Sequence, residues 1–170
     1  MDLGRGPLVF ELVHGEALVA CAAWSLGESG VELVDPMLAW EDLVGLCVER
    51  DEPLVLHDAL CPLVPPSFIA ECVARAVAED AVVLGTRPVT DTIKRVEHGL
   101  VGVGVDRSSL LAVASPLVIP AAVLRTVAER PSHLLGVAAS ALAAAGHRVV
   151  PVEAPPEGRA VSSAAEVRVL

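Results

Sequence analysis

Apolar and polar positions alternate along the chain in two different rhythms. Helical spacing predicts helices over 16–25, 40–50, 66–77, 120–129 and 133–145, the first of them apolar on nearly every side. Short apolar runs predict buried strands over 31–34, 53–57, 81–85 and 148–152. Helices that alternate with strands are typical of an α/β layered fold with a mostly parallel sheet. With no internal repeat and no evident linker, we expect one domain over residues 1–170.

The stretch 87–111 departs from this rhythm. Residues 88–96 and 100–105 both alternate loosely between apolar and polar, and Glu97-His98-Gly99 lies between them with the composition of a turn. This pattern predicts a β-hairpin.

The composition limits the class of protein. Hydrophobic residues make up 54% of the 170 residues and the mean hydropathy is +0.61, which excludes a disordered chain. Aromatic residues account for only 2%, so the core must consist largely of Val, Leu and Ala. The longest apolar stretch, 110–124, is interrupted by Ser115, Pro116 and Pro120 and falls short of the ~20 residues of a membrane span. Without a membrane span or a signal peptide, we expect a cytoplasmic protein with no membrane partner.

Charge and cysteine usage exclude further classes. The net charge of −10 opposes binding to nucleic acid and disfavours polyphosphates. Lys94 is the only lysine of the 12 basic residues. The four cysteines form no C-x-x-C pair and have no histidine at zinc-finger spacing, so we expect structural thiols rather than a zinc site: Cys21, Cys47, Cys61 and Cys72.

Three segments carry the candidate chemistry. Residues 53–63 read P-L-V-L-H-D-A-L-C-P-L, residues 88–95 read P-V-T-D-T-I-K-R, and residues 105–110 read V-D-R-S-S-L. In this order and spacing they resemble the V-H-D-A-A-R-P, P-V-x-D-T-x-K-R and V-D-R-x-x-L signatures of the 2-C-methyl-D-erythritol 4-phosphate cytidylyltransferase family. Ser115-Pro116 follows where that family has T-P.

The resemblance implies a Rossmann-like nucleotidyltransferase fold, a three-layer sandwich whose hairpin forms a protruding β-arm over about 87–111. In that family the arm embraces a second subunit. Asp58 and Ala59 would lie in the substrate region, with Asp58 as a ligand for Mg²⁺ if the chain is active. Thr92 and Arg107 would bind the sugar-alcohol phosphate in the partner's site, where an arginine can grip phosphate bidentately. The supporting residues would be Asp91, Lys94 and Asp106.

The chain also departs from the family pattern. The first strand with its Gly-rich loop, A-A-G-x-G-x-R, is missing, and Gly4-Arg5-Gly6 reads as a flexible start. The segment between Val34 and Pro53 is too short for the family's G-G-x-x-R-x-x-S-V element. Three cationic positions are replaced: a lysine by Leu8, the arginine of the first signature by Cys61, and a late lysine by Ala160.

The lost charges favour a catalytically impaired homologue. A charge-assisted hydrogen bond contributes about 1.5–3 kcal/mol, so three losses would weaken CTP binding by several powers of ten. We therefore expect a dimerising binding or regulatory protein, a homodimer or heterodimer through the arm, that binds CTP or a polyol phosphate weakly. The alternatives are an active enzyme that transfers CMP from CTP to methylerythritol phosphate or a related polyol phosphate, and a chain whose true start lies upstream.

Each candidate also has a purely structural interpretation. His57 reads as a strand-end histidine satisfied by a backbone group, and Asp58 as a turn aspartate that caps local backbone. The charged hairpin residues could form a solvated face. Trp24 and Trp40 read as core or interface anchors. Ser108 and Ser109 have no neighbouring base pattern, so we expect no serine nucleophile there.

Overall fold

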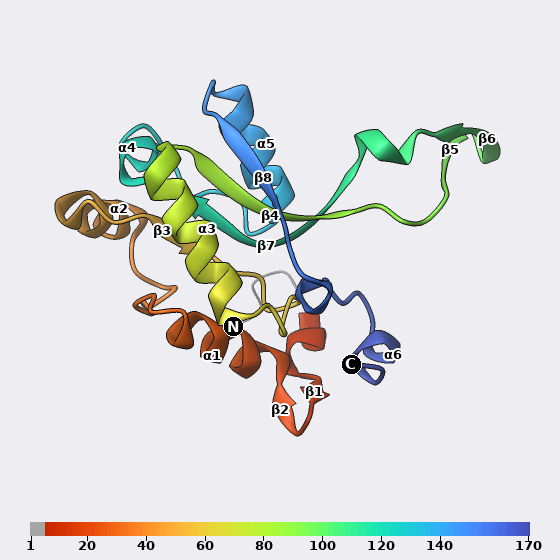
Figure 1. Ribbon diagram of the computed structural model, residues 1–170, viewed down its shortest axis with the longest axis horizontal. Coiled ribbons are helices and arrows are strands. Elements are labelled where there is room, and N and C mark those ends of the chain that lie inside the picture. Colours follow the sequence, from red (N-terminus) through yellow and green to blue (C-terminus); the bar gives the residue numbers. More distant parts are fainter. Residues whose placement is uncertain (1–5) are drawn as a thin grey trace.

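A mixed four-stranded sheet between two layers of helices forms the body of the molecule (Figure 1). The structure, a computed structural model, describes residues 6–170, so the expectation for Gly4 and Arg5 falls outside the described residues. In chain order the elements are η1 (Gly6–Phe10), β1 (Leu12–Val13), β2 (Glu16–Ala17), α1 (Leu18–Glu28), α2 (Trp40–Arg50), β3 (Leu54–Leu56), α3 (Pro66–Glu79), β4 (Val82–Pro88), β5 (Ile93–Glu97), β6 (Leu100–Val105), η2 (Arg107–Ser109), β7 (Leu111–Ile119), α4 (Ala121–Leu124), α5 (Leu135–Ala144), β8 (Val149–Glu153), η3 (Pro156–Gly158) and α6 (Ala164–Val167).

The strand order is β3-β7-β4-β8. β7 pairs antiparallel with both β3 and β4, whereas β4 and β8 pair in parallel. β3, β4 and β8 therefore run in one direction and β7 alone runs against them. The predicted α/β three-layer fold is confirmed, and the sheet expected to be mostly parallel is mixed, with one parallel and two antiparallel pairings.

Each face of the sheet has its own apolar core. α2, α4 and α5 cover one face through a cluster that includes Leu43, Leu117 and Leu142. α3 covers the other face through a cluster that includes Ile69 and Val118, and α1 packs against α3. A strand buried on both faces is apolar at successive positions, which is why β4 begins with residues that are all inaccessible to solvent.

β4 and β7 approach each other unusually closely at one point. A Cβ atom on Gly85 would lie 2.6 Å from the carbonyl oxygen of Ser115 and 3.2 Å from the nitrogen of Pro116. The register of the two strands shifts between Leu84 and Thr86 at this place. Because the opposing atoms belong to the backbone, only glycine fits here.

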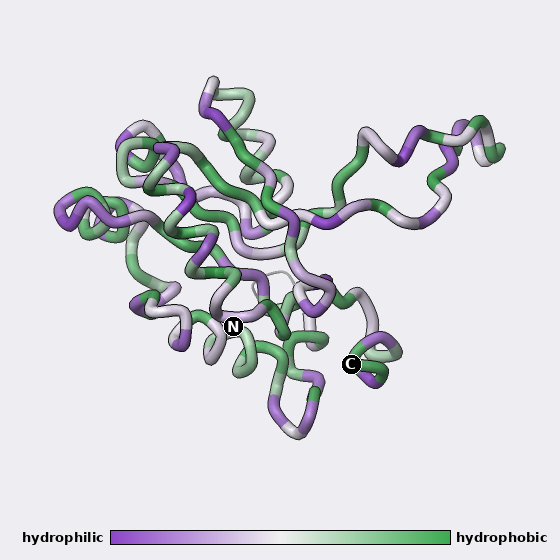
Figure 2. Tube along the Cα trace, viewed as in Figure 1, coloured by the Kyte–Doolittle hydropathy of each residue, from purple (hydrophilic) through white to green (hydrophobic). Residues whose placement is uncertain are grey.

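The predicted hairpin forms an arm that extends away from the sheet (Figure 1). β5 and β6 pair with each other in a separate two-stranded sheet. Apolar positions gather at the far end of this arm (Figure 2). Val96, Leu100, Val101 and Val103 are between 62% and 81% exposed, so nothing in the described chain covers them.

A third, smaller apolar cluster joins the beginning and the end of the described chain. Val13 and Leu18 pack there against Val161 and Val167. Leu8 and Leu60 lie partly buried against the same cluster. The C-terminal segment is thereby fixed beside the loop that follows β3.

Several local predictions are wrong. Residues 31–34 form no strand, and β7 is a central strand that the sequence pattern did not predict because Pro116 interrupts it. The helix expected over 120–129 is limited to α4, and the helix expected over 16–25 begins only at Leu18. Trp24 is 62% exposed and so not a core residue, whereas Trp40 is buried and donates its Nε1–H to the carbonyl of Val127 at 3.0 Å.

Within the described residues the predicted structural thiols form no disulfide, and three of them are buried: Cys47, Cys61 and Cys72. Burial raises the pKa of the Cys72 thiol to about 12, which keeps it protonated and unreactive. Among residues 6–170, no helix is both long and apolar enough to cross a membrane.

Candidate functional site

Asp58 lies in the loop directly after β3, at the end of the sheet where α/β folds place their sites. Its backbone N–H donates to Ser115 Oγ at 3.0 Å, and its Oδ1 accepts the Leu60 amide at 3.0 Å. The second contact is the local backbone cap expected of a turn aspartate. Strand β7 and the loop itself therefore fix the position of this carboxylate.

His57 is held from the same direction by Ser115. Its Nδ1 lies 2.5 Å from Ser115 Oγ, and Ser115 is completely buried. The Ser115 hydroxyl accepts the Asp58 amide and shares a hydrogen bond with His57 Nδ1, whose donor depends on the imidazole tautomer. The expected backbone partner of His57 is thus wrong, since a serine hydroxyl takes that place.

The His57 ring stays neutral in this setting. Burial lowers the pKa of His57 from its ordinary value of 6.5 to about 4, because the charged form would be desolvated. Its Nε2 is buried and has no hydrogen-bond partner among the described residues. At neutral pH the imidazole therefore brings no positive charge to the site, and Ser115 is too deeply buried to attack a substrate.

The loop does not assemble a protein-held metal site. Within residues 6–170 no group of three or more His, Cys, Asp or Glu side chains could hold a metal ion. Asp58 is a single carboxylate whose Oδ1 already accepts an amide. Magnesium in phosphate-transfer sites is held by one or two carboxylates together with substrate phosphates. A Mg²⁺ ion at Asp58 would thus have to arrive with those phosphates, and we derive no step through it.

The positions where the resemblance expects cations converge beside Asp58. Cys61 follows in the same loop, where its amide donates to the Asp58 carbonyl at 2.8 Å. The Val161 amide donates to the Leu60 carbonyl at 2.8 Å, which places Ala160 next to this loop. Leu8 contacts the apolar cluster that contains Leu60 and Val161. Cys61 and Leu8 pack into two separate apolar clusters and Ala160 is exposed, so none of the three positions supplies a cation.

The predicted arm residues lie on exposed surface. Asp91, Thr92 and Lys94 are all exposed, and Arg107 donates to the carbonyl of Thr90 across the base of the arm. Asp106 caps η2 by accepting the Ser108 amide at 3.0 Å and the Ser108 hydroxyl at 2.8 Å. These bonds from Ser108 lower the pKa of Asp106. Ser108 thus stabilises this turn through its two hydrogen bonds to Asp106.

Within one chain the structure does not bring the arm to the Asp58 loop. Figure 1 shows β5 and β6 at the far end of the arm, well away from β3. The candidate residues therefore form two groups: His57, Asp58 and Ala59 at the sheet, and Asp91, Thr92, Lys94, Asp106 and Arg107 on the arm. Ser115 joins the first group, and the sequence signal that pointed to it was its match to the T-P position.

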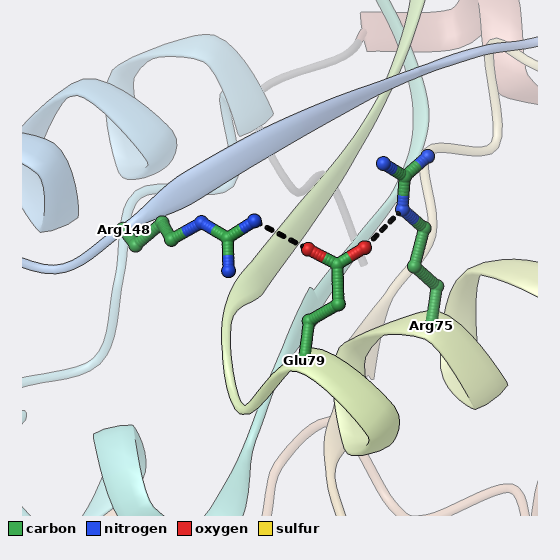
Figure 3. A network of polar contacts seen from close by, with 3 residues as sticks. All are labelled: Arg75, Glu79 and Arg148. Carbon is green, nitrogen blue, oxygen red and sulfur yellow. Dashed lines mark hydrogen bonds and ion pairs between the residues drawn. The ribbon is translucent and has the colours of Figure 1, made fainter.

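The best-connected ion pairs lie elsewhere on the molecule. Glu79 at the end of α3 accepts from Arg75 at 2.7 Å and from Arg148 at 2.5 Å (Figure 3). The hydrogen bond from Arg75, with a smaller contribution from Arg148, lowers the pKa of Glu79. The network ties α3 to the residue before β8 and uses two arginines that could otherwise meet an anionic ligand.

Comparisons with known proteins agree on one family. The sequence model of 2-C-methyl-D-erythritol 4-phosphate cytidylyltransferase matches residues 42–161. The cytidylyltransferase of this name from Rhodococcus jostii is 37% identical over 117 residues, which cover 68% of this chain and 50% of that protein. The Corynebacterium efficiens protein is 36% identical over 107 residues, which cover 62% of this chain and 36% of that protein. The chain thus spans half or less of the length of these relatives.

Solved structures show the same fold. A crystal structure of 4-diphosphocytidyl-2C-methyl-D-erythritol synthase superimposes with a TM-score of 0.73 at 18% identity, covering 96% of this chain and 92% of that one. The cytidylyltransferase from Thermus thermophilus superimposes with a TM-score of 0.66, also at 18% identity and with the same coverage of both chains. At this identity the likeness concerns the fold.

Proposed function

Because the chain belongs to the 2-C-methyl-D-erythritol 4-phosphate cytidylyltransferase family, we propose that it is a dimerising binding or regulatory member that does not transfer CMP alone. The family acts in isoprenoid biosynthesis by the non-mevalonate route. The observation that carries the proposal is that uncharged residues, Leu8, Cys61 and Ala160, occupy the positions around the Asp58 loop where the resemblance expects cations.

The binding free energy lost with the missing cations is large enough to favour a binding protein over an enzyme that transfers CMP. Each charge-assisted hydrogen bond contributes about 1.5–3 kcal/mol, so even two losses would weaken a bound triphosphate by about two to four powers of ten. Cys61 is only 1% exposed within an apolar cluster, where an arginine would be costly to place. His57 does not compensate, because its low pKa keeps it neutral.

The arm supports the dimerising part of the proposal. An isolated two-stranded hairpin is marginally stable in water, yet this one exposes Leu100, Val101 and Val103 at 71% or more. Exposed apolar patches of this kind mark interaction sites. The partner would be a second copy or an intact member of the family, and Thr92 and Arg107 would then face the partner's phosphate site. A cytoplasmic location stays a prediction.

A turnover assay tests the first half of the proposal. The full chain is incubated with CTP, Mg²⁺ and methylerythritol phosphate while pyrophosphate release is followed, with an intact cytidylyltransferase as the positive control. We expect no release above the protein-free blank. Turnover that disappears in Asp58→Ala would overturn the proposal and establish the active enzyme.

Restoring one cation tests whether the missing positive charge is what weakens CTP binding. Ala160 is exposed, so Ala160→Lys should leave the fold intact and tighten CTP binding about tenfold, the value of about 1.4 kcal/mol. Ala165→Lys in α6 adds the same charge at another exposed position and should not tighten binding. Titration calorimetry measures both variants, and equal affinities would contradict the proposed role of the missing charge.

Co-expression tests the partner. The tagged chain is expressed with the intact cytidylyltransferase of its host, purified through the tag, and sized by light scattering. Recovery of mixed dimers favours a regulatory role, and dimers of the tagged chain alone favour self-association. A chain that stays monomeric at every concentration would refute the dimerising role.

A further inference from the structure

The outer edge of β3 lacks a strand partner. Among residues 6–170, β3 lies at the end of the strand order and pairs with β7 only. In an antiparallel ladder, alternate residues direct their N–H and C=O groups away from the partner. β3 therefore presents unpaired main-chain groups on its second edge. Natural proteins cover or block such edges, because free edges invite pairing with other chains.

Residues 31–34 lie near this edge without joining it. They follow Gly30, whose φ of 83° turns the chain, and end at Asp35, whose Oδ1 accepts the Met37 amide at 2.8 Å. Their sequence, V-E-L-V, is rich in strand-forming residues. In the described part of the chain, none of their backbone groups takes part in a strand ladder.

The segment and β3 line one cleft. Its volume is about 360 Å³, and its walls include Val31, Glu32 and Val34 on one side and Leu54 and Val55 on the other. Side chains from the two walls pack into the same apolar clusters. Val31 packs against the same apolar cluster as Val55, on the α3 face of the sheet.

The other face repeats this match. Val34 packs against the same apolar cluster as Leu54 and Leu56, on the face covered by α2 and α5. Residues three apart in an extended chain point to opposite sides. The segment therefore has the side-chain alternation of a further strand of this sheet.

We propose that residues 31–34 are a strap that closes on the free edge of β3 as a fifth strand. Closure would pair main-chain groups on both segments and shield Leu33, which is 55% exposed. The ion pair between Arg50 and Glu32, at 2.6 Å, holds the strap close to the end of α2. Since β3 leads directly into His57 and Asp58, closure would also steady the start of the site loop. The inference is independent of the proposed function.

Amide hydrogen exchange on the full chain, resolved to single residues, tests the strap. Strand pairing protects alternate amides, so we expect alternate amides of residues 31–34 and the outward amides of β3 to exchange at least about tenfold slower than in unstructured peptides. That factor corresponds to about nine closed molecules in ten. Protection below tenfold at all of these amides overturns the proposal.

Proline variants separate strand pairing from simple burial. Glu32→Pro and Leu33→Pro each remove one backbone donor, and one of these donors must face β3. At least one proline variant should lose the protection of the β3 edge while its matched control, Glu32→Ala or Leu33→Ala, keeps it. Amides of the β4–β7 ladder report whether each variant is folded. Protection that survives both prolines, or that is lost equally in the alanine controls, refutes the strap.

Discussion

The strand pair β4–β7 and the arm pair β5–β6 belong to one continuous stretch of the chain, yet the first pair is buried and the second is exposed. Val and Leu recur in both pairs, although β5 also carries charged residues. Val83 and Leu117 in the sheet are completely inaccessible, whereas Val101 and Val103 in the arm are 71% and 81% exposed. Helices cover the sheet on both faces, whereas within residues 6–170 nothing covers the arm (Figure 1). The apolar pattern thus determines that a strand forms, and neighbouring elements determine whether it is buried.

Truncating a leucine should have its largest effect in the sheet. Leu117 is completely buried among residues of α2, α4 and α5, so Leu117→Ala should lower the free energy of unfolding by about 2–5 kcal/mol. Leu100→Ala removes the same atoms from a side chain that is 75% exposed and should cost no more than about 0.5 kcal/mol. Urea unfolding at low protein concentration measures both. Equal losses would show that the arm is folded against its own chain.

Acid should destabilise the sheet side through His57. Its pKa of about 4 in the folded chain lies below the ordinary 6.5. As the pH is lowered, the unfolded chain takes up a proton at this histidine before the folded chain does, so the folded chain loses stability as the pH decreases from 6.5 to about 4. The loss approaches about 3 kcal/mol once pH reaches the folded pKa, at 1.36 kcal/mol per pKa unit.

Measurements from pH 7 to pH 5.5 avoid most carboxylate titration and isolate the upper part of this contribution. The slope should flatten in His57→Gln. It should persist in His98→Gln, which removes an exposed histidine at the turn of the arm. An unchanged slope in His57→Gln would contradict the neutral buried imidazole.

Adding one methyl group to a glycine should destabilise the β4–β7 ladder more than the β5–β6 ladder. Gly85→Ala places a Cβ 2.6 Å from the Ser115 carbonyl oxygen and should cost about 1–3 kcal/mol, because overpacked backbone must shift. Gly104→Ala in β6 meets nothing closer than 3.7 Å, the mobile Nζ of Lys94, and should be close to neutral. Thermal unfolding of the two variants gives the comparison, and a neutral Gly85→Ala would mean that the strands can separate there at little cost.

A charge on the exposed arm should have the smallest effect on the unfolding free energy and the clearest effect on the oligomeric state. Val103→Asp places a charge on the exposed arm and should change the unfolding free energy of the single chain by at most about 0.5 kcal/mol. If the arm is an interface, the same change should shift the mass seen by light scattering toward the monomer. Glu97→Asp, a conservative change at another exposed arm position, is the control. Unaltered dimers in Val103→Asp would place the interface elsewhere.

The sequence alone determined the elements whose patterns are local. The hairpin, α2, α3 and the strand before Asp58 follow from spacing that needs no knowledge of the rest of the chain, and the signatures around Asp58, Thr92 and Arg107 indicated the family. The Asp58 turn was predictable as well, because an aspartate and the amide two residues later form a local contact.

The tertiary structure decided what depends on distant partners. β7 is a central strand despite Pro116, because β3 and β4 pair with its two edges. Residues 31–34 have strand composition but form no ladder in the structure, because composition alone does not bring a partner edge within hydrogen-bonding distance. The hydroxyl that holds both His57 and Asp58 comes from Ser115, 58 and 57 residues away, and the low pKa of His57 comes from burial. Burial and long-range contacts are properties of the assembled layers, so no local pattern could encode them.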